Sequence, residues 1–165
     1  MRIILFTFIL SLSLTSIAET KLQKPVGEVI LEVGGNLAKT NVDEQAHFDR
    51  AMIEALPQEK IITSNHVIDK ATTYTGPKLE SLLAYLGAKG DKVKVTALDD
   101  YTSELSRADI KKFGVILATH ENGKQLTLDD RGPFFVVFPF NDYKELQHDL
   151  YYNMSVWQVM LIEVE

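Results

Sequence analysis

Four leucines at helical spacing are the feature that most constrains the fold of this chain. Most pairs among them are three or four positions apart, which places them on one face of a helix. They are Leu79, Leu82, Leu83 and Leu86. Pro77 suits the first turn of this helix, and Gly87 suits its end. Leu82 and Leu83 lie at the centre of the stripe, so we expect both to be buried in the core.

Several short segments have the pattern of strands. Val93, Val95 and Ala97 alternate with polar residues, as in a half-buried strand. The continuous apolar run from Phe134 to Phe138 predicts a buried strand. Asn122-Gly123 between apolar segments is a strong hairpin signal. Other strands are expected at 28–33, 60–63, 114–119, 125–128 and 156–164, with a polar loop at 72–76.

Two further short helices are expected. Asn41 and Glu44 form a capping box, after which Phe48, Met52 and Leu56 recur four apart. A second capping box, formed by Ser106 and Asp109, predicts a helix that reaches Phe113. Strands outnumber helices and the two are not in strict alternation, so the predicted class is α+β with mixed or antiparallel sheets and short helices.

The first eighteen residues have the pattern of a cleaved signal peptide. Arg2 precedes a mostly apolar run, and Ser16-Ile17-Ala18 gives a small-x-small cleavage site before Glu19. The alternative is an uncleaved anchor, but the run is shorter than the roughly 20 residues that span a bilayer. We therefore expect one domain, residues 19–165, exported to the periplasm and not inserted in the membrane after cleavage.

Charge and cysteine content exclude several classes of function. Without Arg2 the 17 basic residues become 16, against 23 acidic ones, so the net charge of the 147 remaining residues is −7. This balance argues against binding of nucleic acid or of an anionic membrane surface. The sequence has no cysteine, which excludes lipidation at a cysteine, a thiol nucleophile and thiolate-bound metals.

The histidines and short motifs predict no catalytic or metal site. His47, His66, His120 and His148 are scattered, without a His-x-x-x-His pair. Serine-nucleophile, P-loop and dinucleotide-binding motifs are also absent.

Polar and aromatic residues gather directly after or before the predicted strands, where a rigid sheet presents a pocket. The candidate ligand-binding residues are Asn65, His66, Asp100, Tyr101, Arg131, Tyr152, Ser155 and Trp157. Tyr151, Tyr152 and Trp157 are candidates to stack on a flat ring. Arg131 offers a fork for ligand oxygens, and Asp100 can accept from an amino-imino edge. The simpler alternative makes Trp157 a core residue and Arg131 a surface ion-pair partner.

Taken together, the segments resemble the oxidoreductase molybdopterin-binding domain family, which has the sulfite-oxidase fold, from about Val29 to Val164. The matching motifs are Gly76-x-x-Leu79-x-x-Leu82-Leu83-x-x-Leu86-Gly87, Ala97-Leu98-Asp99-Asp100-Tyr101, Ile116-Leu117-Ala118 with Asn122-Gly123-Lys124, Gly132-Pro133 before a strand ending in Pro139, and Ser155-Val156-Trp157 before Ile162-Glu163-Val164.

One departure from this family concerns its chemistry. Its molybdenum enzymes ligate the metal with a cysteine after an early strand, near a Cys-x-x-Asn motif. The matching stretch here is Ile62-Thr63-Ser64-Asn65-His66, which keeps the asparagine and has no thiolate. A hydroxyl or imidazole is a poor substitute for that soft ligand, so we expect no catalytic cofactor and no enzyme activity.

Cysteine-less exported proteins of this fold are similar to a group of periplasmic pterin-binding proteins. The resemblance implies that the chain binds a reduced pterin and regulates an inner-membrane enzyme that makes or degrades cyclic di-GMP. On this view it docks on the periplasmic region of that diguanylate cyclase or phosphodiesterase, or of another membrane sensor. Two alternatives stay open: a molybdopterin oxidoreductase subunit that holds its metal without cysteine, and an interaction protein without a working pocket.

Overall fold

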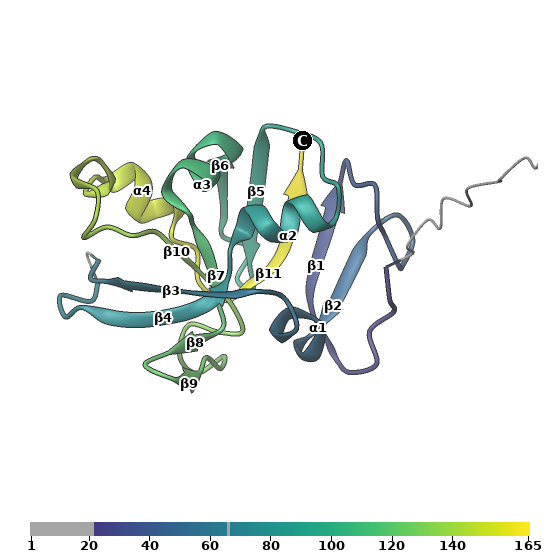
Figure 1. Ribbon diagram of the computed structural model, residues 1–165, viewed down its shortest axis with the longest axis horizontal. Helices are drawn as coiled ribbons and strands as arrows, with labels where there is room; N and C mark the ends of the chain where they lie inside the picture. The colour runs from purple at the N-terminus through teal and green to yellow at the C-terminus, as the bar shows by residue number, and fades with distance from the viewer. Residues whose placement is uncertain (1–21, 66) are drawn as a thin grey trace, which may run out of the picture.

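The computed structural model describes residues 22–65 and 67–165, and this part of the chain forms three sheets (Figure 1). The largest sheet has five strands, in the order β2–β1–β11–β5–β6. Their bounds are β1 (Val29–Gly35), β2 (Ala46–Asp49), β5 (Lys92–Ala97), β6 (Thr102–Ser106) and β11 (Val159–Val164). β1 and β11 are parallel and the other neighbours are antiparallel. The mixed sheet expected from the sequence is therefore confirmed.

The two other sheets are antiparallel. One has the order β3–β4–β8–β9, formed by β3 (Gln58–Thr63), β4 (Thr72–Pro77), β8 (His120–Glu121) and β9 (Lys124–Gln125). The other pairs β7 (Ile116–Ala118) with β10 (Phe135–Val137). In Figure 1 the long β3–β4 hairpin reaches away from the five-stranded sheet, on the side where helix α4 (Asp149–Met154) lies.

The helices are short and pack on the sheets. Besides α4 they are α1 (Arg50–Glu54), α2 (Leu79–Tyr85), α3 (Arg107–Phe113) and the 3₁₀ helix η1 (Lys144–Leu146). The four leucines at and just after α2 are fully buried in one cluster with residues of the large sheet, among them Leu31, Val95 and Ile162. The helix predicted from the leucine stripe is thus confirmed. No helix within the described ranges is long and apolar enough to cross a membrane.

The helix expected to begin near Asn41 is wrong. Asp43 and Glu44 have positive φ angles of 37° and 65°, which a right-handed helix does not allow. The following residues pair with β1 as strand β2. Helix α1 begins later, where the Asp49 side chain accepts the Met52 N–H at 2.9 Å. Phe48 and Met52 therefore do not share a helical face. Phe48 belongs to strand β2, because it pairs with Leu31 of β1, and Met52 belongs to helix α1.

The polar loop expected at 72–76 is also wrong, because this segment is strand β4 along the whole of β3. Its Tyr74 is fully buried. Gly76 passes so close to β7 that a Cβ there would lie 2.1 Å from the Leu117 carbonyl oxygen. Pro77 ends this strand instead of starting a helix.

The last strand begins at Val159 and not at Val156, because Gln158 has a positive φ of 51° that interrupts the extended backbone. The hairpin is confirmed at Asn122-Gly123, both with positive φ, although its strands β8 and β9 are short. The predicted signal peptide lies outside the described residues.

Candidate functional site

A pocket of about 290 Å³ opens where segments distant in sequence meet. Its walls come from the β3–β4 loop, the β5–β6 turn, the chain around the start of β10, and the end of α4 with the segment that leads from it to β11. A volume of this size is near the lower end of the range for small-ligand sites, about 300–1,000 Å³.

Most of the predicted site residues line this pocket. They are Asn65, Tyr101, Arg131, Tyr152, Ser155 and Trp157. His66 lies outside the described residues, and Asp100 is not part of the lining. The lining residues that the predicted set lacked are Val67, Ile68, Asp99, Phe135, Asn153 and Val156.

The β5–β6 turn brings Asp99, and not Asp100, to the pocket. Asp100 is the left-handed residue of the turn, with φ 65°, and its N–H donates to the Ala97 carbonyl at 3.1 Å. The Asp99 carboxylate accepts the Tyr101 N–H at 3.1 Å, so the turn holds the two pocket residues together. Of the two adjacent carboxylates, the one available to a ligand in this pocket is therefore Asp99.

Trp157 lies outside strand β11 with 43% of its surface exposed. The preceding Val156 is buried, and its carbonyl accepts the Val136 N–H at 2.8 Å. The following Gln158 donates its N–H to the Arg131 carbonyl at 2.9 Å. With its neighbours fixed in this way, Trp157 borders the pocket, and the alternative that it is a core residue is excluded.

Two adjacent tyrosines of α4 have different surroundings. Tyr151 packs edge-on against Phe113, with ring centroids 5.7 Å apart, and does not line the pocket. Burial raises the pKa of the Tyr151 hydroxyl. Tyr152 lines the pocket and rests on Phe140, at 5.0 Å between centroids. Of the candidates for ring stacking, Tyr152 and Trp157 therefore remain.

Asn65 shapes the β3–β4 loop, which forms one wall of the pocket. Its side-chain oxygen accepts the N–H groups of Val67 at 2.9 Å and Ile68 at 2.8 Å. Its own N–H donates to the Ile68 carbonyl at 2.9 Å. The turn brings the apolar side chains of Val67 and Ile68 to the pocket, where no local sequence pattern had predicted them. The Asn65 amide nitrogen is the group it offers to a ligand.

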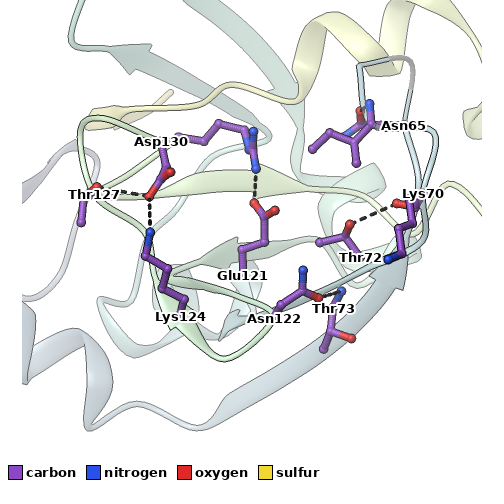
Figure 2. A network of polar contacts seen from close by, with 11 residues as sticks. Asn65, Lys70, Thr72, Thr73, Glu121, Asn122, Lys124, Thr127 and Asp130 are labelled. Atoms are coloured by element: carbon purple, nitrogen blue, oxygen red, sulfur yellow. Dashed lines mark hydrogen bonds and ion pairs between the residues drawn. The ribbon is translucent and has the colours of Figure 1, made fainter.

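Arg131 combines both roles considered for it, because it lines the pocket and also forms an ion pair with Glu121. Figure 2 shows this charged contact at the Glu121 carboxylate. The Arg131 Nε is buried, and within the described part of the chain it has no hydrogen-bond partner. The guanidinium carbon lies 6.0 Å from the centre of the Phe135 ring. A buried N–H donor without an acceptor is costly, so the ion pair leaves part of the hydrogen-bonding capacity of this guanidinium unsatisfied.

Tyr74 lies behind this ion pair, opposite Glu121 in the β4–β8 register and edge-on to Phe135 at 5.5 Å. Burial and the charge of Glu121 raise the pKa of Tyr74 to about 12. The phenol is therefore neutral at physiological pH, and Glu121 has Arg131 as its ionic partner.

The donor set of the pocket does not match a thiolate-bound metal. The whole sequence lacks cysteine, and the described residues contain no group of three or more histidine and carboxylate side chains suited to a metal ion. The organic part of such a cofactor fits better. Aromatic side chains, the Asp99 carboxylate and the unpartnered Arg131 Nε suit a flat ring with a donor–acceptor edge.

Comparisons with known proteins agree with this geometry. The model of the family described as "Oxidoreductase molybdopterin binding domain" matches residues 40–141. The fold is similar to the crystal structure of the sulfane dehydrogenase SoxCD from Paracoccus pantotrophus, with a TM-score of 0.60 and 18% sequence identity. That match covers 81% of this chain and 37% of the SoxCD chain, and at this identity it shows the fold alone. Among curated proteins no match is found.

Proposed function

Because this chain belongs to the oxidoreductase molybdopterin-binding domain family, we propose that its pocket binds a pterin and that the protein acts by binding, without redox catalysis. The observation that carries the proposal is the composition of the pocket. Aromatic side chains, one carboxylate and a buried unpartnered N–H surround a hollow of about 290 Å³, in a sequence without cysteine.

Each wall of the pocket supplies a different interaction. Trp157 and Tyr152 provide ring surface for stacking, which contributes about 1–3 kcal/mol per aromatic residue in nucleobase recognition. The Asp99 carboxylate accepts from the amino-imino edge of the pterin. The Arg131 guanidinium, which lines the pocket, donates to a ring carbonyl. Val67 and Ile68 cover the ring from the β3–β4 loop.

The molybdenum part of the family cofactor does not fit these residues. A molybdenum site in this family uses a soft thiolate, and hydroxyl and amide groups are hard ligands. Asn65, Thr63 and Ser64 are the side chains near the matching position. For this reason we assign the chain a pterin as ligand and no catalytic cofactor.

Docking on a membrane partner completes the proposal. The resemblance to cysteine-less periplasmic proteins supports export and regulation of an inner-membrane cyclic di-GMP enzyme through its periplasmic region. Exposed apolar side chains next to the pocket agree with docking there: Leu98, Tyr101 and Trp157 are about half exposed. A partner that covers these residues would contact the mouth of the pocket and respond to its ligand.

Purification of the protein from its natural host tests the proposal. The protein is denatured, and the released small molecules are identified by fluorescence and mass, while metals are measured in parallel. We expect a pterin at close to one per chain, without stoichiometric molybdenum. Stoichiometric molybdenum would favour the alternative of an oxidoreductase subunit that holds the metal without cysteine. Intact mass in the same sample shows whether the chain begins at Glu19.

A further inference from the structure

The charges at the pocket do not favour an anionic ligand. Among the described lining residues only Asp99 and Arg131 are charged. The single cation is already paired with Glu121. The pocket lining together with this partner therefore carries two carboxylates and one guanidinium.

The ion pair is partly shielded from water, and within the described part of the chain neither side chain forms a second ion pair. The side chains of Arg131 and Glu121 are only 22% and 23% exposed, so water screens their attraction weakly. The other cation near Glu121 is Lys124, which pairs with Asp130 at 3.6 Å. Asp130 also accepts a hydrogen bond from Thr127 (Figure 2). Among the residues that the structure describes, Arg131 is thus the cation that forms an ion pair with Glu121.

We infer that this charge arrangement makes the pocket selective for an uncharged pterin and against one that carries a phosphate. The inference rests on the proposed function and specifies the ligand class of the same site. A phosphate monoester carries a charge of about −1.5 to −2 at neutral pH. Glu121 already neutralises the guanidinium, so a phosphate beside Arg131 would gain little net attraction from it and would be repelled by Asp99. A neutral ring carbonyl meets no such repulsion and can accept from the guanidinium while the ion pair stays intact.

Glu121 is accordingly the specificity-determining residue, although it does not line the pocket itself. It acts by occupying the guanidinium that would otherwise bind an anion. The same arrangement opposes the phosphate-bearing molybdopterin, independently of the missing thiolate.

The test compares neopterin with neopterin monophosphate by calorimetry on the purified protein, for the wild type and two variants. We expect the phosphate ester to bind the wild type about tenfold more weakly or worse. Glu121→Gln should narrow this ratio to within about threefold, because Arg131 is released. The control Glu59→Gln removes the same charge from an exposed pair with Lys78 at 3.3 Å and should leave the ratio unchanged.

Each outcome decides the inference. Equal binding of both compounds to the wild type overturns it and leaves the proposed pterin function intact. Binding of neither compound overturns the proposed function and this inference with it. If Glu121→Gln does not fold, Asp99→Asn at the exposed turn takes its place and should also narrow the ratio. Equal ratios in the Glu121→Gln and Glu59→Gln variants would show that the ion pair is not the cause.

Discussion

The Tyr101 hydroxyl donates a hydrogen bond to the Asn153 carbonyl oxygen at 3.0 Å and so joins two walls of the pocket. Tyr101 follows the β5–β6 turn, and Asn153 is near the end of α4, 52 positions later in the chain. Asp99, on one side of this contact, and Trp157, on the other, both line the pocket. This bond therefore helps to hold the carboxylate and the stacking ring in their relative position, together with the Leu98 N–H, which donates to the Gln158 carbonyl at 3.0 Å.

Tyr101→Phe should weaken pterin binding without unfolding the protein. The lost hydrogen bond contributes about 0.5–1.5 kcal/mol. Because Tyr101 is about half exposed, we expect the loss in the free energy of unfolding to lie at the lower end of this range. Tyr85→Phe is the control, because Tyr85 is similarly exposed and lies outside this pocket. Calorimetry and thermal melts measure both effects. Equal binding by the two variants and the wild type would show that the bond does not organise the pocket.

Arg131→Ala should lower the stability of the protein as well as its ligand binding. The substitution leaves the Glu121 carboxylate, 23% exposed, without its cation. The double variant Arg131→Ala/Glu121→Gln should recover part of the loss, with a coupling of about 0.5–3 kcal/mol between the two sites. Urea unfolding of the four proteins in the cycle gives this coupling. Additive effects would mean that the ion pair does not contribute to folding.

The leucine stripe of α2 gives a prediction for the core. Leu82 and Leu83 are fully buried, so Leu82→Ala or Leu83→Ala should cost about 2–5 kcal/mol of the free energy of unfolding. Ser81→Ala, at an exposed position of the same helix, is the control and should change little. A loss as small as that of the control would contradict the packing of α2 on the sheet.

Asp49 predicts a dependence of stability on pH. Backbone N–H groups of Gly27, Met52 and Val26 donate to its carboxylate and lower its pKa in the folded protein. A lowered folded-state pKa contributes stability that is complete above the unfolded value of about 3.9 and is lost as the pH falls through the folded value.

Asp49→Asn should therefore be less stable than the wild type at neutral pH, with a difference that shrinks below about pH 4. Urea unfolding at several pH values measures this, with Asp142→Asn at an exposed carboxylate as the control. A difference that stays constant with pH would mean that the charge of Asp49 is not responsible.

Local patterns were sufficient for some elements of the fold and failed for others. The α2 stripe and the apolar run at 134–138 give unambiguous patterns. The helix buries one whole stripe of leucines, and the run at 134–138 is buried on both faces. Strand β4 has threonines on both sides of Tyr74, and only its pairing with β3 and β8 makes it a strand. Threonine and tyrosine favour strands, but in a polar segment this preference is too weak to decide the structure without the tertiary contacts.

The candidate site, like the fold, was predictable from the sequence only in part. Residues that follow strands, such as Tyr101 and Trp157, were found because strand ends present pockets. The choice between Asp99 and Asp100 depends on the φ of a single residue, which adjacent identical residues do not reveal. The pairing of Arg131 with Glu121 depends on how the β8–β9 hairpin lies against the chain before β10.

The most direct test of pterin binding at this pocket uses Trp157, the single tryptophan of the sequence. Titration with a reduced pterin such as dihydroneopterin should quench its emission to saturation, beyond the loss seen with free tryptophan under the same conditions. Trp157→Ala should stay folded, because the side chain is 43% exposed, and should lose about 1–3 kcal/mol of binding free energy in calorimetry. Emission that falls only as far as that of free tryptophan, with no heat of binding, would contradict the account.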